Sequence, residues 1–496
     1  MPRKIVERLP DVAALILSGC VIWEAWMALN QLYGEEISNH ALYRFTGTFL
    51  NPGPFSGFIA MGVPLAVHHL LVVKGRVDLL TKAQSFIAYT TLALCLLLLP
   101  AGMSRSAWIA AITGGMAVYG MHRRAAIKRW CNTLLRSRKG VMIVGVFLFV
   151  GIGAGWGTFH LKKDSANGRL LMWKVACQAI AEQPWTGYGT DGFPTAYAET
   201  QEQYFANGNG TAEEIYVAGT PEHAFNEYLT IAVKYGIGGL AIILIIGITA
   251  FVCAVHCGAL GIAGALLAVG VFALSSYPLQ LPDFLSAAIV LVTVPLVTRG
   301  KLSNKFSPLV VCNLSLVAFV PFLYWGMTKA GIWKDRYEAV KEWQNLRTLY
   351  HMEAYNMVCE DYAPLYERMR WNPNYLFEYG RSLHQAGCHK ESNKVLEEAE
   401  LLCGDPMILN IQGKNYEALE NFDHAAAIYQ RAYHRLPNRI YPLYLEMKMC
   451  ASDKCNQQER ARELAHQILE TQEKIPSQAV EEMKGKAKEI ISLSTH

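Results

Sequence analysis

The amino-acid sequence predicts an all-α protein, with a polytopic helical membrane domain followed by an α-helical solenoid. Of its 496 residues, 52% are hydrophobic and only 17% are charged. The apolar residues gather before residue 328, in runs long enough to cross a bilayer, and the charge density rises sharply beyond it. A period of 33 residues in the C-terminal part predicts stacked helices. We therefore expect a membrane domain over residues 1–330 and a helical repeat domain over residues 331–496.

Apolar runs predict about nine membrane-spanning helices, because about 20 apolar residues cross the hydrocarbon layer. The runs lie near residues 11–30, 53–73, 84–102, 106–121, 141–160, 237–256, 259–276, 283–298 and 309–328. The first run follows Met1-Pro2-Arg3-Lys4 and lacks the features of a cleavable signal peptide, so we expect a retained span.

Basic residues orient these spans, since Lys and Arg favour cytoplasmic loops. Residues 122–140 carry seven basic residues and no acid, and smaller basic clusters lie at 3–8, 74–82 and 299–305. All four clusters fall on one side if nine spans alternate. The N-terminus is then cytoplasmic, and the motif loop (residues 161–235) and the C-terminal domain lie outside.

The motif loop is polar, glycine-rich and aromatic although it lies between apolar runs, and long loops on a fixed scaffold commonly carry function. Capping signals place three residues of interest at predicted helix starts. The pairs of cap and residue are Ser104 and Arg105, Asn167-Gly168 and Arg169, and Thr220-Pro221 and His223. Helix N-termini attract anions and Arg forks bind phosphate oxygens, so the pattern predicts a diphosphate site.

A helix start before His223 would favour a neutral imidazole, which suits a general base for a hydroxyl. The spacing from His223 onward predicts a polar stripe along one helix, which Gly236 then breaks. The stripe comprises His223, Asn226, Glu227, Thr230 and Lys234.

Simpler interpretations stay open on spacing alone. An Arg at a membrane interface commonly snorkels or pairs with a headgroup, and a His near a helix start commonly caps it. Trp173, Trp185 and Tyr188 also fit an aromatic belt at the interface.

In their order, the motifs resemble the O-antigen ligase-like superfamily, which groups ligases with Wzy polymerases. The matching residues are Ser104-Arg105-Ser106-Ala107, Gly168-Arg169-Leu170-Leu171-Met172-Trp173, Pro184-Trp185-Thr186-Gly187-Tyr188-Gly189 and His223-Ala224-Phe225-Asn226-Glu227-Tyr228-Leu229. The segment Gly47-Thr48-Phe49-x-Asn51-Pro52 also looks like the family, and the resemblance covers about residues 45–300. One departure is that the usual His-Asn pair is split, since Asn226 follows His223 by three residues.

The resemblance implies a metal-independent, inverting glycan transferase of the bacterial inner membrane, with the motif loop and the C-terminal domain in the periplasm and with no cofactor. It implies a glycan donor on polyprenyl diphosphate, a lipid or protein acceptor and contact with membrane lipids, but no nucleic acid. Arg105 and Arg169 would bind the diphosphate, and His223 would take the proton from the acceptor hydroxyl. The predicted substrate-binding set is Arg105, Arg169, Trp173, Tyr188 and Asn226.

Three activities fit this site: ligation to lipid A-core or another surface glycan, polymerisation of repeat units, and O-linked transfer to protein. A transporter would instead show charged or broken helices at mid-membrane depth. The ionisable residues here gather at the outer ends. Tyr277 and Asp283 could line the site, and by default they are taken as structural. A membrane-anchored repeat scaffold would leave the loop motifs unexplained, and the twelve cysteines show no metal-ligand spacing.

The C-terminal period resembles tetratricopeptide repeats. Gly380, Leu396 and Ala399 recur as Gly413, Tyr429 and Ala432. Two units are expected at 373–405 and 406–437, with flanking helix pairs at 335–370 and 440–490. Such a stack binds a peptide or protein partner, or it serves as a scaffold for the motif loop.

Overall fold

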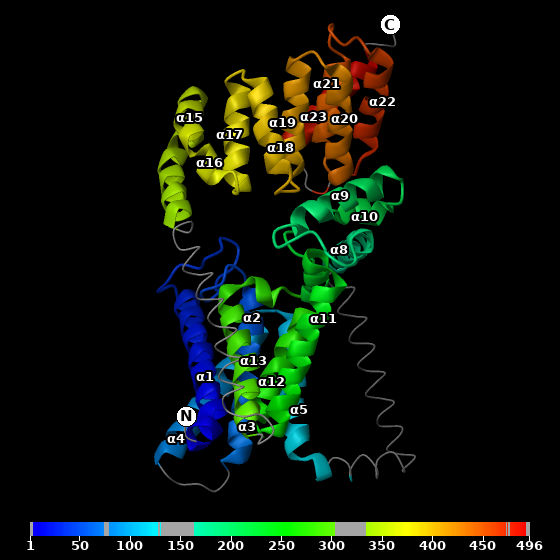
Figure 1. The fold of residues 1–496 in the computed structure, drawn as a ribbon. Coiled ribbons are helices and arrows are strands. Elements are labelled where there is room, and N and C mark those ends of the chain that lie inside the picture. The colour runs from blue at the N-terminus through cyan, green and yellow to red at the C-terminus, as the bar shows by residue number, and fades with distance from the viewer. Residues whose placement is uncertain are drawn as a thin grey trace, which may run out of the picture. The chain divides into compact units, whose positions relative to one another are not determined.

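A computed structural model describes residues 3–73, 79–126, 129, 163–302, 334–472, 474 and 477–492. Every regular element in these ranges is a helix, which confirms the predicted all-α class (Figure 1). The described residues divide into two compact units. The first holds residues up to 129 with 223–232 and 237–302, and the second holds 163–222, 233–236 and 334–492. The predicted domain boundary near residue 330 lies outside the described residues.

The first unit is a bundle of apolar helices. Its elements are α1 (Arg3–Tyr33), α2 (Pro52–Ala60), α3 (Gly62–Val72), α4 (Leu79–Ala101), α5 (Arg105–His122), most of α11 (Glu227–His256), α12 (Leu260–Ala273), the short η1 (Pro278–Gln280) and α13 (Pro282–Leu302). Met61 separates α2 from α3, which together form one apolar segment.

Five segments in the described ranges are long and apolar enough to cross a membrane. They are Arg8–Tyr33, Pro52–Val72, Thr81–Ala101, Glu227–His256 and Pro282–Arg299, and Leu260–Ala273 is a shorter apolar helix. The predicted spans at 141–160 and 309–328 lie outside the described residues, so the count of nine stays a prediction.

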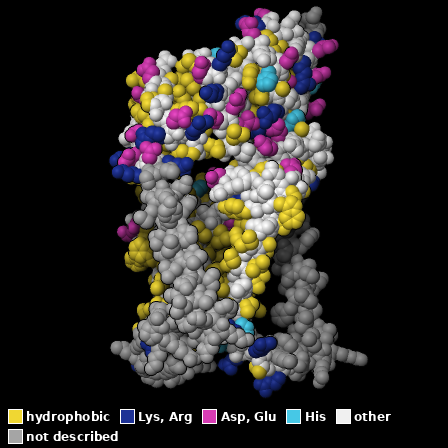
Figure 2. Space-filling model, in the orientation of Figure 1, with side chains coloured by type: hydrophobic (Ala, Val, Ile, Leu, Met, Phe, Trp, Pro, Cys, Tyr) yellow, Lys and Arg dark blue, Asp and Glu magenta, His cyan; other side chains and the backbone are white. Residues whose placement is uncertain are grey.

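Large apolar side chains cover the outside of the first unit, as contact with lipid requires. Trp23, Ile245 and Ile248 are each more than half exposed. Figure 2 shows apolar side chains along the helices of this unit, whereas many charged side chains cover the repeat helices. Inside the bundle, small residues let helices approach closely. A Cβ on Gly114 of α5 would lie 2.7 Å from the carbonyl O of Gly264 in α12, so the two backbones are in contact.

The second unit contains the helices of the motif loop and the C-terminal stack. The loop helices are α8 (Lys163–Glu182), α9 (Phe193–Ala206) and α10 (Ala212–Val217). The stack consists of a helix over 334–351, α15 (Tyr355–Tyr362), η2 (Ala363–Leu365), α16 (Tyr366–Met369), α17 (Pro373–Gln385), α18 (His389–Glu400), α19 (Pro406–Ala418), α20 (Phe422–Arg435), α21 (Tyr441–Cys450), α22 (Gln458–Glu470) and α23 (Gln478–Ser492).

The same glycine contact occurs in two successive helix pairs of the stack. A Cβ on Gly380 would lie 2.6 Å from Leu396, and a Cβ on Gly413 would collide with the ring of Tyr429. Leu396 and Tyr429 are fully buried. The period of 33 residues in the sequence is therefore a period of tight helix packing, although the assignment to tetratricopeptide repeats stays a prediction.

Helix α9 of the motif loop packs on helix α20 of the stack. Glu202 of α9 accepts from Arg431 and Arg435 of α20, each at 2.8 Å, and Glu400 accepts from the same two guanidiniums at 2.7 and 2.6 Å. Burial raises the pKa of Glu400, but Arg435 and Arg431 outweigh burial and hold that pKa below its usual value. The loop helices and the stack thus share one network of charges.

Candidate active site

Helix α5 begins at Arg105, as predicted, and Ser104 occupies its N-cap position with an extended backbone. The Ser104 side chain makes no capping hydrogen bond and lies instead 3.3 Å from the Oγ of Ser106. Arg105 is exposed. The helix start therefore places a guanidinium in the first turn, at the end of a helix whose N–H groups attract anions.

Two buried polar side chains of α1 fix the segment before α2. Gln31 Oε1 accepts from the backbone N of Thr46 and Gly47 at 2.7 and 2.9 Å. The Glu24 carboxylate accepts from Thr48 N at 3.0 Å and from Thr48 Oγ1 at 2.7 Å. Gly47 has a φ of +60°, and a Cβ there would lie 2.5 Å from Glu24 Oε2. Gly47 and Thr48 of the Gly-Thr-Phe motif are thus fixed by their contacts with α1.

The structure corrects the predicted helix start at Arg169. Helix α8 begins at Lys163, so Arg169 lies six residues inside it and not in its first turn. Asp164 is the acidic residue of the first turn, and Asn167 donates to Glu213 of α10 at 3.4 Å and does not cap the helix. Arg169 and Trp173 are half-buried and, four residues apart, lie on the same face of α8.

The Pro-x-x-Gly-x-Gly motif forms a turn that bonds to the backbone of α11. The N–H groups of Tyr188 and Gly189 donate to the carbonyls of Val233 and Lys234, each at 2.9 Å. Gly187 has a φ of +63°, and a Cβ there would lie 2.6 Å from the Lys234 carbonyl. The motif therefore needs glycine for both backbone conformation and close approach.

The partner of this turn is the break in α11, which the sequence predicts at Gly236. Gly236 has a φ of 68°, and a Cβ on it would collide with the Trp185 carbonyl. Beside the turn, the Tyr188 hydroxyl donates to Glu182 at 2.9 Å, and burial together with this hydrogen bond raises the pKa of Tyr188. Tyr188 is thus fixed at the end of α8.

The structure also corrects the predicted helix start before His223. Helix α11 begins four residues after His223, and Asn226 is its N-cap. The Asn226 Oδ1 accepts from Tyr228 N at 3.1 Å and from Leu229 N at 3.2 Å. Phe225 has a φ of 47°, which no α-helix continues through. His223 therefore lies in an irregular segment, and the argument from a helix dipole does not apply to it.

The predicted polar stripe is correct only inside the helix. Glu227, Thr230 and Lys234 are buried along one face of α11, with exposed fractions of 1%, 0% and 9%. His223 and Asn226 precede that face. In the split His-Asn pair, the asparagine therefore has a structural role as the N-cap of α11.

The His223 imidazole packs against the ring of Tyr277, a residue that the sequence analysis took as structural. The two ring centroids are 4.9 Å apart and the planes are tilted by 35°. Phe225 meets the same tyrosine edge-on at 5.3 Å. Tyr277 precedes the short helix η1, in a turn that contains Pro278 and Pro282. These prolines predict a turn, but nothing in the sequence predicts its contact with His223.

Buried Glu227 holds that turn. Its Oε2 accepts from Leu279 N at 2.9 Å and its Oε1 accepts from Gln280 Nε2 at 2.6 Å. The predicted site residues are thus distributed over both units. Arg105, His223 and Asn226 belong to the first unit, and Arg169, Trp173 and Tyr188 belong to the second.

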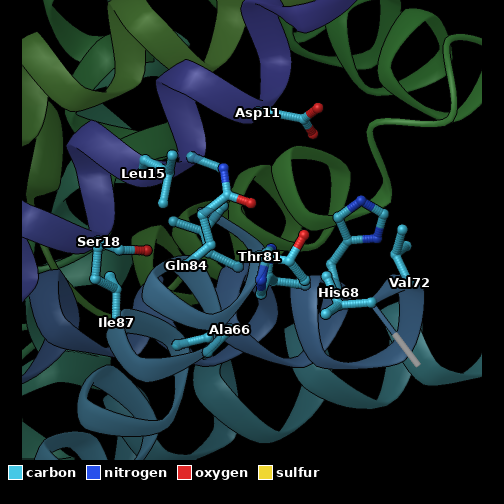
Figure 3. A pocket seen from close by; sticks show the side chains of 14 residues that line it. Asp11, Leu15, Ser18, Ala66, His68, Val72, Thr81, Gln84 and Ile87 are labelled. Atoms are coloured by element: carbon cyan, nitrogen blue, oxygen red, sulfur yellow. The ribbon is translucent and has the colours of Figure 1, made fainter. Parts of the chain in front are cut away.

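A separate pocket of about 110 Å³ lies between α1, α3 and α4, lined by residues that include Asp11, His68, Thr81 and Gln84 (Figure 3). It contains none of the predicted site residues. Asp11 precedes Glu24 by 13 residues of α1, about 20 Å along the helix, so this pocket is distinct from the segment that Glu24 fixes. In the described ranges, no group of three or more His, Cys, Asp or Glu side chains is arranged to hold a metal.

The apolar helices, the motif loop and the arrangement around His223 define a multi-pass membrane protein with a candidate catalytic loop. Residues 90–244 match the family described as O-antigen ligase. This segment contains Arg105, Arg169 and His223, and the match agrees with the resemblance that the motifs indicated. A comparison with curated proteins gave no match. The family implies glycan transfer of the ligase or polymerase type, with a glycan donor, an acceptor and membrane lipids as partners.

Proposed function

We propose that the protein is an O-antigen ligase-like glycosyltransferase, which moves an oligosaccharide or polysaccharide from a polyprenyl-diphosphate carrier to an acceptor hydroxyl. The observation that carries the proposal is the family match over residues 90–244, which includes all three motif residues predicted to do the chemistry. The acceptor is lipid A-core or another surface glycan. The site faces the periplasm from the bacterial inner membrane, and domain 1–330 carries the chemistry.

The proposed reaction is a single displacement at the anomeric carbon. The acceptor oxygen forms a bond to that carbon while the bond to the diphosphate oxygen breaks, and the configuration inverts. His223 takes the acceptor's proton, and the guanidiniums of Arg105 and Arg169 neutralise the charge that the leaving diphosphate gains. As the family resemblance implies, the step is metal-independent and uses no cofactor.

Trp173 and Tyr188 bind the donor glycan beside this centre, and Asn226 supports it through the backbone. Trp173 shares a face of α8 with Arg169, and an aromatic ring in that position offers a stacking surface to a sugar. Tyr188 is held by Glu182 on the neighbouring turn. Asn226 contributes by ending the irregular segment that contains His223.

The experiment that tests the proposal is transfer by His223→Ala and Arg169→Ala proteins, with membrane abundance matched by immunoblot. Both changes should abolish transfer. Unchanged activity in both would overturn the mechanism. The products of a deletion strain separate the activities: a ligase leaves finished polymer on the carrier, and a polymerase leaves single repeat units.

O-linked transfer to protein is the second candidate, because the C-terminal stack packs on the motif loop through Glu202 and Arg435. A cleft of about 610 Å³ between α21 and α23 offers a place for a protein partner. Its lining includes Tyr441, Tyr444, Met483 and Lys486. Loss of glycoproteins in the deletion strain would favour this activity, and unchanged glycan products would favour a membrane-anchored scaffold instead.

A further inference from the structure

We infer that Glu227 is a positioning residue for the transfer, acting through the turn 277–280 to hold Tyr277 against His223. This inference rests on the proposed function, because it assigns a role beside the proposed base. Glu227 itself is only 1% exposed, so it supports the base from behind and does not meet the substrate.

The carboxylate of Glu227 is anchored at both oxygens. One accepts the backbone N–H of Leu279 at 2.9 Å and the other accepts the side-chain amide of Gln280 at 2.6 Å. Hydrogen bonds to an ionised carboxylate are shorter and stronger than those between neutral groups. Glu227 also lies in the first turn of α11, where the helix dipole favours a negative charge. The two hydrogen bonds of this buried carboxylate therefore fix Leu279 and Gln280 relative to α11.

The anchored turn determines where the Tyr277 ring lies. Tyr277 is two residues before Leu279 and is the residue that precedes η1. Its ring contacts His223 at 4.9 Å and Phe225 at 5.3 Å. Fixing Leu279 and the next residue therefore fixes the surface against which the imidazole packs.

The same first turns of α11 hold the other side of His223. Ala224, the next residue, is fully buried and donates its N–H to Thr230 Oγ1 at 3.2 Å. Thr230 Oγ1 in turn donates to the carbonyl of Asn226 at 3.0 Å. The backbone after His223 and the ring beside it are therefore both set by α11.

A general base needs this control of position. Misplacement of a reacting group by about 1 Å costs on the order of 100-fold in rate. Loss of the Glu227 anchor should lower kcat, because the imidazole and its tyrosine neighbour lose a defined arrangement. The KM for the donor should change little, since Glu227 does not touch the donor.

The first comparison is between Glu227→Leu and Glu227→Gln in the full-length protein. Leu keeps the side-chain bulk but accepts no hydrogen bond, and we expect kcat to fall at least 20-fold. Gln still accepts from Leu279, and Gln280 can turn its amide to accept from the new NH₂ group, so we expect kcat within about threefold of the parent. Glu222→Gln, an exposed carboxylate beside His223, is the matched control and should leave kcat unchanged.

A double-mutant cycle with Tyr277→Ala tests the route of the effect. If Glu227 acts through Tyr277, the double variant with Glu227→Leu should be no less active than the less active of the two single variants. Tyr277→Phe keeps the ring and should retain kcat. The inference would be overturned if the fold losses of kcat in the two single variants multiplied in the double variant. Full activity of Glu227→Leu would also overturn it.

These outcomes are distinct from failure of the proposed function. Full activity of His223→Ala would show that His223 is not the general base, whatever the Glu227 variants do. An inactive His223→Ala protein with a fully active Glu227→Leu protein would leave the transferase proposal intact and remove only the positioning role. If Glu227→Leu does not accumulate in membranes, Tyr277→Ala replaces it and tests the same contact from the side of the tyrosine.

Discussion

At the scale of single residues, the two arginines should depend on their forked shape as well as on their charge. A guanidinium binds two phosphate oxygens at once, whereas an ammonium is a point charge. Arg169→Lys should therefore lower transfer at least tenfold and raise the KM for the diphosphate donor. The measurement is initial rate against donor concentration in purified protein. Rates equal to the parent would mean that Arg169 contributes charge alone.

The glycines of the Pro-x-x-Gly-x-Gly turn should differ sharply in their tolerance of alanine. Gly187 combines a positive φ with a carbonyl 2.6 Å from a built Cβ, so Gly187→Ala should cost more than about 2 kcal/mol of stability. Gly189 also has a positive φ but no atom within 4 Å of a built Cβ, so its alanine should cost only about 1 kcal/mol. Thermal unfolding of the two variants measures the difference. Equal midpoints would contradict the proposed backbone contact.

At the scale of elements, the cap signals of the sequence predicted one helix start correctly and failed at two others, where contacts with other parts of the chain decide. Ser104 precedes a helix start, although its side chain makes no capping hydrogen bond. Asn167 resembles a cap, but its amide bonds to another helix and α8 continues through it. Near His223, the left-handed Phe225 delays the helix. No local sequence pattern predicts the hydrogen bond of Asn167 or the left-handed conformation of Phe225.

The contact between α9 and α20 should be among the most sensitive in the second unit. Arg435 is 1% exposed and bonds to Glu202 and Glu400, so Arg435→Ala removes the buried guanidinium and leaves these two half-buried carboxylates with Arg431 as their shared cation. We expect a loss of about 3–5 kcal/mol, as for other broken buried pairs. Arg431 makes similar bonds with a 38% exposed side chain, and Arg431→Ala should cost about 1 kcal/mol.

Denaturant unfolding of the two variants, followed by tryptophan fluorescence, compares these costs. A second readout is transfer activity, which should fall in Arg435→Ala because α9 belongs to the motif loop. If Arg435→Ala were as stable as Arg431→Ala, the charge network would not be what joins the loop to the stack.

At the scale of the whole molecule, composition and periodicity predicted the all-α class, the apolar helices and the paired helices of the stack. These features follow from the solvent that each face meets and from repeated small residues such as Gly380 and Gly413. The sequence left a scaffold role of the stack for the motif loop open as one of two interpretations, but it did not predict which residues join the two. Their contact depends on Glu202 meeting Arg435 from more than 200 residues away, and sequence spacing carries no signal for such a pair.

The orientation of the chain in the membrane is the last testable expectation. Four basic clusters on one side predict a cytoplasmic N-terminus, with the C-terminal stack on the opposite face. Two single-cysteine proteins, with every other cysteine replaced by serine, probe the two faces. One retains Cys388, which is exposed in the stack, and the other carries Arg129→Cys, at an exposed position in the basic cluster 122–140.

In spheroplasts, a membrane-impermeant maleimide should label Cys388 before lysis and the residue-129 cysteine only after lysis. This result follows if Lys and Arg hold the 122–140 cluster in the cytoplasm and an odd number of spans separates the N-terminus from the stack. The reverse pattern would invert the orientation. Labelling of both cysteines only after lysis would place the stack in the cytoplasm. The stack could then not contact a periplasmic acceptor, and a role of the stack in binding that acceptor would be excluded.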